Sequence, residues 1–63
     1  RVRVSSKGAT RLLAHHPWVY RSDVLEGPDQ PGLYPVVSSR GVMGLALYNP
    51  NSEISVRVFS FKD

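Results

Sequence analysis

The sequence contains no cysteine. This absence excludes a disulfide framework, a zinc site built on cysteine ligands and a thiol nucleophile. No apolar run approaches the roughly 18 residues that a membrane-spanning helix needs. The first residues, RVRVSSKG, contain no apolar segment of the kind found in signal peptides. We therefore expect a small domain that is held together by side-chain packing alone.

Acidic residues are missing from the first 22 positions. Those positions carry five cations, namely Arg1, Arg3, Lys7, Arg11 and Arg21. The remaining 41 residues contain three cations and five acids, which gives them a net charge of −2. Such polarity favours an anionic partner on the N-terminal side, although a basic face that only meets solvent has the same pattern.

What the chain does have is enough residues for one thin core. A domain near 63 residues buries only roughly 60% of the surface that its unfolded form exposes. Apolar residues make up 41% of the sequence, which suffices for a compact β-rich fold. The sequence does not begin with methionine and stops after FSFKD, so we expect residues 1–63 to be a single domain from the N-terminal part of a longer protein.

Apolar residues at helical spacing predict one short helix over about residues 9–16, with Ser5 or Ser6 as its cap. Its apolar face consists of Ala9, Leu12, Leu13 and His16. Pro17 ends it, because the residue before a proline is pushed out of the α region. Two turns do not persist alone, so the helix must pack against strands.

Alternating apolar and polar residues predict five strands. They are RVRVS at 1–5, WVYRSDVL at 18–25, LYPVVSS at 33–39, VMGLALY at 42–48 and EISVRVFSF at 53–61. Pro35 indicates an edge or a bulge, and the small Gly44 and Ala46 suit a place where another segment crosses closely. Close strand spacing favours a mainly β fold, a small mixed barrel of about five strands with one helix.

No catalytic constellation emerges from the polar residues. Adjacent His15 and His16 would point about 100° apart on a helix, so they do not converge on one metal ion. A relay of Ser22, His16 and Asp23 can be drawn, but serines are too common here for it to carry information. No glycine-rich phosphate loop is present. We therefore expect no catalytic, metal-binding or cofactor-binding residue in this chain.

Binding is the alternative to catalysis. Lys7 and Arg11 stand four residues apart, so they can share a helix side and meet adjacent phosphates, or simply face solvent. Tyr20 and Tyr48 can each complete the core or offer a ring to a base. We expect Trp18 to be the largest buried side chain of the core.

Two stretches, KGATRLLAHHPWVYRSDV and RGVMGLALYNPNSEISVRVFS, resemble the N-terminal segment of bacterial SAM-dependent methyltransferases that make 5-methylcytosine in 23S ribosomal RNA. In that family Lys-Gly precedes a short helix that leads to His-Pro-Trp and an aromatic residue. A second block pairs a glycine-rich strand with Tyr-(Asn/Ser)-Pro-x-Ser and Ile-x-x-Arg-Val. The matching residues here are Lys7-Gly8, His16-Pro17-Trp18, Tyr20, Tyr48-Asn49-Pro50, Ser52, Ile54 and Arg57-Val58. The chain departs from the family at Ala14 and His15, where relatives often carry arginines.

The resemblance implies a PUA-like domain, a small pseudo-barrel used in cytoplasmic RNA-modifying enzymes. Such a domain helps position ribosomal RNA and is not itself an enzyme, because the S-adenosylmethionine site and the catalytic cysteine belong to later domains. Candidate RNA-binding residues are Arg3, Lys7, Arg11, Tyr20, Arg21 and Tyr48. His16, Pro17 and Trp18 are expected to form a structural junction, in which Trp18 anchors the helix to the barrel and His16 satisfies a backbone group.

A docking module is the rival interpretation. Its outer surface of Arg57, Phe59 and Phe61 would pack on the catalytic domain or join two copies of the full-length protein, without contact to RNA.

Overall fold

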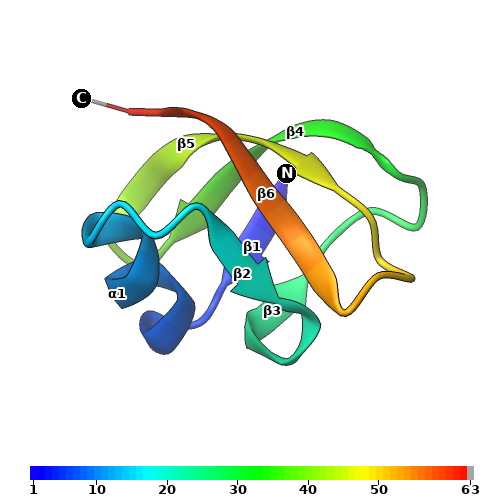
Figure 1. Ribbon diagram of the computed structural model, residues 1–63, viewed down its shortest axis with the longest axis horizontal. Helices are drawn as coiled ribbons and strands as arrows, with labels where there is room; N and C mark the ends of the chain where they lie inside the picture. The colour runs from blue at the N-terminus through cyan, green and yellow to red at the C-terminus, as the bar shows by residue number, and fades with distance from the viewer. Residues whose placement is uncertain (63) are drawn as a thin grey trace.

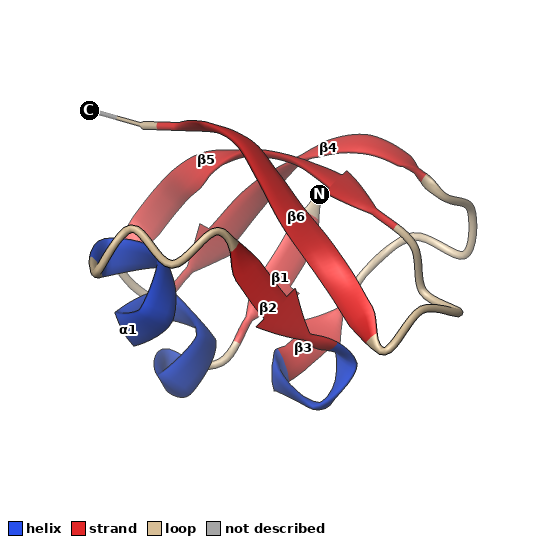
Figure 2. Ribbon diagram, viewed as in Figure 1, coloured by secondary structure: helices blue, strands red, loops and turns tan. Residues whose placement is uncertain are grey.

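The computed structural model describes residues 1–62 as one curved six-stranded sheet, an α-helix and a short 3₁₀-helix (Figures 1 and 2). The strands lie in the order β2-β6-β5-β4-β1-β3, and every neighbouring pair is antiparallel except β1 and β4. Their bounds are β1 Val2–Val4, β2 Trp18–Tyr20, β3 Val24–Glu26, β4 Gly32–Ser38, β5 Gly41–Tyr48 and β6 Ile54–Phe61. The helices are α1, Ser6–Leu13, and η1, Arg21–Asp23.

The sheet curls into a nearly closed barrel because its two edge strands are consecutive in the chain. Only η1 separates β2 from β3, and four Cα steps span at most about 14 Å. In a flat sheet of six strands the edges would lie about 24 Å apart. The short connection is therefore compatible only with a strongly bent sheet, which confirms the predicted mainly β pseudo-barrel.

The barrel interior is filled by small and branched side chains from all sides. The buried hydrophobic residues are Val2, Val4, Ala9, Leu12, Val19, Val36, Met43, Ala46, Tyr48 and Val56. The helix contributes Ala9 and Leu12, and it covers one end of the barrel (Figure 2). Within residues 1–62, no helix has the length and apolarity to cross a membrane.

Gly44 marks the close crossing that the small residues of β5 predict. A Cβ atom at this position would lie 2.4 Å from the backbone oxygen of Ser60 on β6. The two strands can pair here only because glycine has no side chain. The pairing of β5 with β6 has a register shift between Leu45 and Ala46, next to this close approach.

The helix lies three residues earlier than predicted, at 6–13 instead of 9–16. Ser5 is its N-cap, as expected, and its side-chain oxygen accepts a hydrogen bond from the backbone N–H of Gly8 at 3.1 Å. Its C-terminus is not set by Pro17. His15 adopts a left-handed conformation with φ of 58°, a position usually held by glycine.

The hydrogen bonds at this C-terminus form a Schellman motif. The backbone N–H of His15 bonds the carbonyl of Leu12 at 2.9 Å, and that of His16 bonds the carbonyl of Arg11 at 2.9 Å. The helical periodicity of the sequence continues to His16, but the chain reverses before that residue. His16 is thus outside the helix, and its backbone, not its ring, completes the cap.

The predicted strand at 18–25 is in fact two strands at opposite edges of the sheet. WVYRSDVL contains no glycine or proline that would mark a break, but the chain turns through η1 after Tyr20. The sheet consequently has six strands instead of five. The other four strands are confirmed with small shifts at their ends.

Turns join β4 to β5 and β5 to β6, and the irregularity expected at Pro35 lies just after that residue. Gly41 follows the β4–β5 turn with φ of 104°. In the β5–β6 connection, the backbone N–H of Ser52 bonds the carbonyl of Asn49 at 3.2 Å. Pro35 precedes the two β4 residues, Val36 and Val37, that pair with β1, and β4 has a register shift between those two residues.

We predict that Gly44→Ala lowers the free energy of unfolding by about 1–3 kcal/mol, the usual cost of overpacking. The added methyl group would meet backbone, which cannot rotate away. Thermal unfolding followed by circular dichroism measures the change, since about 1 kcal/mol shifts Tm by roughly 4–8 °C in a domain of this size. Gly32→Ala is the control, because its new contacts are with the movable ring of Tyr34 and the loss should be smaller. Equal losses would contradict the close-crossing explanation.

A second prediction concerns the helix cap. Ser5→Ala removes the acceptor for the Gly8 N–H and the donor to the Asp23 carboxylate at 3.2 Å, so we expect a loss of about 1 kcal/mol in a urea titration. Ser6→Ala deletes an exposed hydroxyl one position later and should leave the midpoint nearly unchanged. The assignment of Ser5 as cap is wrong if the two variants unfold at the same urea concentration.

Candidate nucleic-acid interface

Two aromatic side chains point outward from the edge strand β2. Trp18 is 42% exposed and Tyr20 is 40% exposed, whereas Val19 between them is completely buried. This distribution follows from the strand itself, in which alternate side chains point to opposite faces. Val19 therefore points into the barrel, and the rings of Trp18 and Tyr20 lie on its outer surface.

This orientation corrects the prediction for Trp18. The indole is not the largest buried side chain of the core and does not anchor the helix from within. Leu12 and five valines are among the fully buried side chains that fill the interior instead. Trp18 and Tyr20 occupy the same face of one strand, so a sequence interpretation that turned Tyr20 outward should have turned Trp18 outward too.

A cation of the helix lies over one of these rings. The guanidinium carbon of Arg11 is 5.6 Å from the centre of the Tyr20 ring, within the range of a cation–π contact. Arg11 is half-buried, and Lys7, one helical turn earlier, is exposed. The predicted pair of helix cations is therefore present on α1, and Arg11 joins it to the aromatic face of β2.

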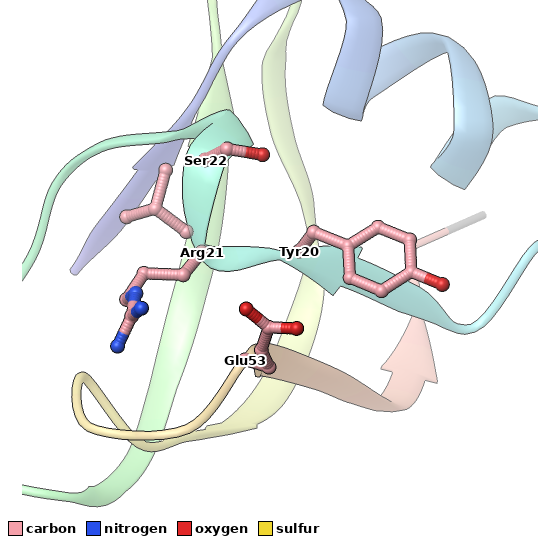
Figure 3. A pocket seen from close by; sticks show the side chains of 5 residues that line it. Tyr20, Arg21, Ser22 and Glu53 are labelled. Carbon is pink, nitrogen blue, oxygen red and sulfur yellow. The ribbon is translucent and has the colours of Figure 1, made fainter.

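Arg21 and Glu53 border an open hollow next to Tyr20. The hollow has a volume of about 550 Å³ and is lined by Tyr20, Arg21, Ser22, Val24 and Glu53. Figure 3 shows the Glu53 carboxylate between the side chains of Arg21 and Tyr20. The backbone N–H of Arg21 donates to the Glu53 carbonyl at 2.8 Å, which fixes the β5–β6 connection beside η1.

The two histidines are used for packing against aromatic rings. His16 meets Trp18 edge-on, with ring centres 5.9 Å apart and an angle of 74° between the planes. His15 stacks flat on Phe61 at 4.8 Å. Among residues 1–62, no three histidine, aspartate or glutamate side chains are grouped so that they could hold a metal ion.

Arg57 lies opposite Trp18 in the strand register. Cross-strand partners project on the same side of a sheet, so the indole and the guanidinium are neighbours on the outer surface. The same row continues to Leu47 on β5 and Leu33 on β4, and both leucines are about half exposed. The row runs across four strands, from the edge strand β2 toward the middle of the sheet.

The structure separates two candidate residues from this group. Arg3 is exposed on β1 and borders a different groove, which it shares with Arg1 and the β4–β5 hairpin. Tyr48 is only 6% exposed and packs edge-on against Tyr34 at 6.0 Å. The prediction that Tyr48 can stack on a base is wrong, because this ring points to the inner face of β5 and belongs to the core.

The interface thus consists of a cationic helix side, an aromatic edge strand and one carboxylate. Of the candidate residues, Lys7 and Arg11 lie on α1, Tyr20 ends β2 and Arg21 begins η1, and Trp18, Arg57 and Glu53 are added to them. The pairing of β2 with β6 places Arg57 beside Trp18, and that pairing could not be read from the sequence. This arrangement can hold a planar, anionic ligand, since it offers rings, guanidinium groups and a hydrogen-bond acceptor.

Comparison with known proteins agrees with this geometry. Residues 2–61 match the family model described as a PUA-like domain. No curated protein matches the chain. Since the match covers nearly every residue and the barrel has the expected form, the chain belongs to the PUA-like domain family.

Proposed function

We propose that this PUA-like domain binds RNA and helps to position ribosomal RNA for a SAM-dependent cytosine-5 methyltransferase whose catalytic domain lies outside this chain. The observation that supports RNA binding best is the Arg11 guanidinium over the Tyr20 ring at 5.6 Å. This contact joins the helix cations to an exposed aromatic strand. The two sequence blocks that resemble the 23S ribosomal RNA methyltransferases support the proposed parent enzyme.

The chemistry of recognition follows from the side chains. Lys7, Arg11 and Arg21 would neutralise phosphates, and such contacts position a protein on RNA without reading its sequence. Arg3, on the neighbouring groove, would extend this contact as a flanking cation. Tyr20 would stack on a base.

The proposal assigns the chemical step to other parts of the parent protein. The sequence has no cysteine and no glycine-rich loop for an adenosyl group, so S-adenosylmethionine and the catalytic nucleophile would belong to the catalytic domain. The parent would act in the cytoplasm, with ribosomal RNA as its partner.

RNA affinity should fall with salt in proportion to the phosphate contacts. Three or four contacts to single-stranded RNA predict a slope of about −2 to −3 in a plot of log K against log salt. Combining Lys7→Ala with Arg11→Ala removes two contacts, so the slope should become shallower by about 1.4. Fluorescence anisotropy of a labelled ribosomal RNA fragment measures both values.

The control is Arg40→Ala, which removes one equal charge from the β4–β5 turn. It should leave the slope nearly unchanged. Arg11→Lys keeps the charge and should retain the slope as well, although it loses the planar contact with Tyr20. A wild-type slope near zero would exclude phosphate-led binding.

Docking to protein is the second candidate function, and one observation favours it. Phe59, on the outer side of β6, is 72% exposed, and Leu33 and Leu47 on the same outer surface are also exposed. Exposed apolar side chains that lie together often mark protein contacts. In this function the domain would pack on the catalytic domain or join two copies of the parent protein.

Phe59→Ser in the full-length protein tests this candidate. Docking predicts a lower Tm of the whole protein, or loss of dimer mass in light scattering, with an unchanged salt slope for RNA. Leu25→Ser is the matched control, since Leu25 is 62% exposed on β3, at the other edge of the sheet. If both variants behave like the wild type in stability and mass, Phe59 is not a docking residue.

A further inference from the structure

We propose that Trp18 and Tyr20 form a two-ring platform on which two consecutive unpaired bases stack, so that the RNA bound here is single-stranded. The inference rests on the proposed RNA-binding function and specifies its ligand. It begins from the finding that both rings face outward on β2, at 42% and 40% exposure. Aromatic side chains on an exposed sheet surface stack two or three bases in other RNA-binding modules.

The outward position of the indole has an energetic cost. A tryptophan side chain is a large source of apolar burial, and a thin core would gain most from it. The strand instead gives the inner position to Val19, which is completely buried. Because the exposed ring contributes less to folding than a buried one, its place on the surface suits a contact with a ligand.

The spacing of the rings suits neighbouring bases. Side chains two apart on a strand are separated by about 6.6 Å along its axis and share one face. Trp18 is 42% exposed and Tyr20 is 40% exposed with Arg11 over its ring, so each side chain has surface open to a base. Two consecutive bases of one RNA strand can therefore stack on the two rings.

Each ring is held in place before a ligand arrives. The Arg11 guanidinium lies over Tyr20 at 5.6 Å, and the His16 ring meets Trp18 edge-on at 5.9 Å. Rings that are already oriented lose less conformational entropy on binding. Arg11 also adds positive charge next to the stacked base, where a cation–π contact strengthens the stack.

The charged side chains around the platform indicate where the phosphates and the bases of the RNA strand lie. Arg57 is the register partner of Trp18, and Arg21 borders the hollow across Glu53 from Tyr20, so each end of the platform has a guanidinium for a phosphate (Figure 3). The carboxylate of Glu53 borders the hollow next to Tyr20 (Figure 3). This carboxylate repels phosphate but accepts a hydrogen bond from an N–H on a base edge, so the base and not the backbone belongs in the hollow.

A duplex cannot use this platform. In an RNA helix the faces of the bases are covered by their neighbours, and only unpaired bases can be splayed onto a protein ring. Phosphate contacts alone would not make this distinction, because both forms of RNA carry them. Preference for single strands is thus a property of Trp18 and Tyr20, separate from the helix cations.

The test measures binding of the full-length protein to three RNAs by fluorescence anisotropy. They are an oligoadenylate of about eight nucleotides, within the usual site size, the abasic strand of equal length and a hairpin duplex. Trp18→Ala and Tyr20→Ala should each weaken oligoadenylate binding by between about 5-fold and 150-fold. Neither should change the affinity for the abasic strand or the salt slope.

Conservative and control variants guard against loss of folding. Trp18→Phe and Tyr20→Phe keep a ring and should retain most of the affinity. Leu25→Ala removes an exposed apolar side chain from β3 and should have no effect on any of the three RNAs. Circular dichroism and Tm verify that every variant is folded.

Three results would overturn the platform, and they differ from failure of the proposed function. The platform is wrong if both alanine variants bind oligoadenylate as the wild type does while the Lys7 and Arg11 variants lose affinity. It is also wrong if the wild type binds the abasic strand or the duplex as tightly as oligoadenylate. Loss of assembly without loss of RNA affinity in Trp18→Ala would assign the ring to a protein contact. Absence of salt-dependent RNA binding in the wild type would instead exclude the proposed function itself.

Discussion

The short link η1 is the constraint on which the rest of the structure depends. It joins β2 and β3, the two edges of the sheet, and therefore forces the sheet to bend back on itself. Asp23 at the end of this link also holds the start of the helix, because its carbonyl accepts from the Ser5 N–H at 2.8 Å and its carboxylate accepts from the Ser5 hydroxyl. The start of α1 is thus held by the same link that joins the two edges of the sheet. The helix packs beside β2, and its Arg11 lies over Tyr20 at the end of that strand.

Local patterns in the sequence were sufficient for much of this fold. Alternation predicts β1, β4, β5 and β6, and the serine before the helix predicts its cap. The break after Tyr20 could not be predicted, since Arg21, Ser22 and Asp23 include no glycine or proline to mark it. The end of the helix could not be predicted either, because His15 adopts the left-handed backbone conformation that is usually held by glycine. The break at η1 coincides with a long-range hydrogen bond from the Arg21 N–H to the Glu53 carbonyl, whereas the helix end is set by the local Schellman bonds of His15 and His16.

The candidate site illustrates the same limit at the level of single side chains. Tyr20 and Tyr48 each stand in an alternating strand, and no local feature distinguishes them. Their fates differ because Tyr20 is on the outer face of β2, next to the buried Val19, whereas Tyr48 is on the inner face of β5 and packs against Tyr34. The error at Trp18 had another cause. Its position two residues before Tyr20 already implied a shared face, and a general expectation about tryptophan was preferred to that spacing.

The resulting division of β2 separates stability from recognition in a very small domain. Its inner residue, Val19, belongs to the core, whereas the outer rings are partly exposed, with Arg11 over Tyr20 and His16 edge-on to Trp18. Changes to the outer rings should therefore cost the fold less than changes to the inner face. A domain with a thin core has few large side chains of this kind. In the proposed function the outer face of β2 leaves Trp18 and Tyr20 available to RNA, because alternate side chains of a strand point to opposite faces.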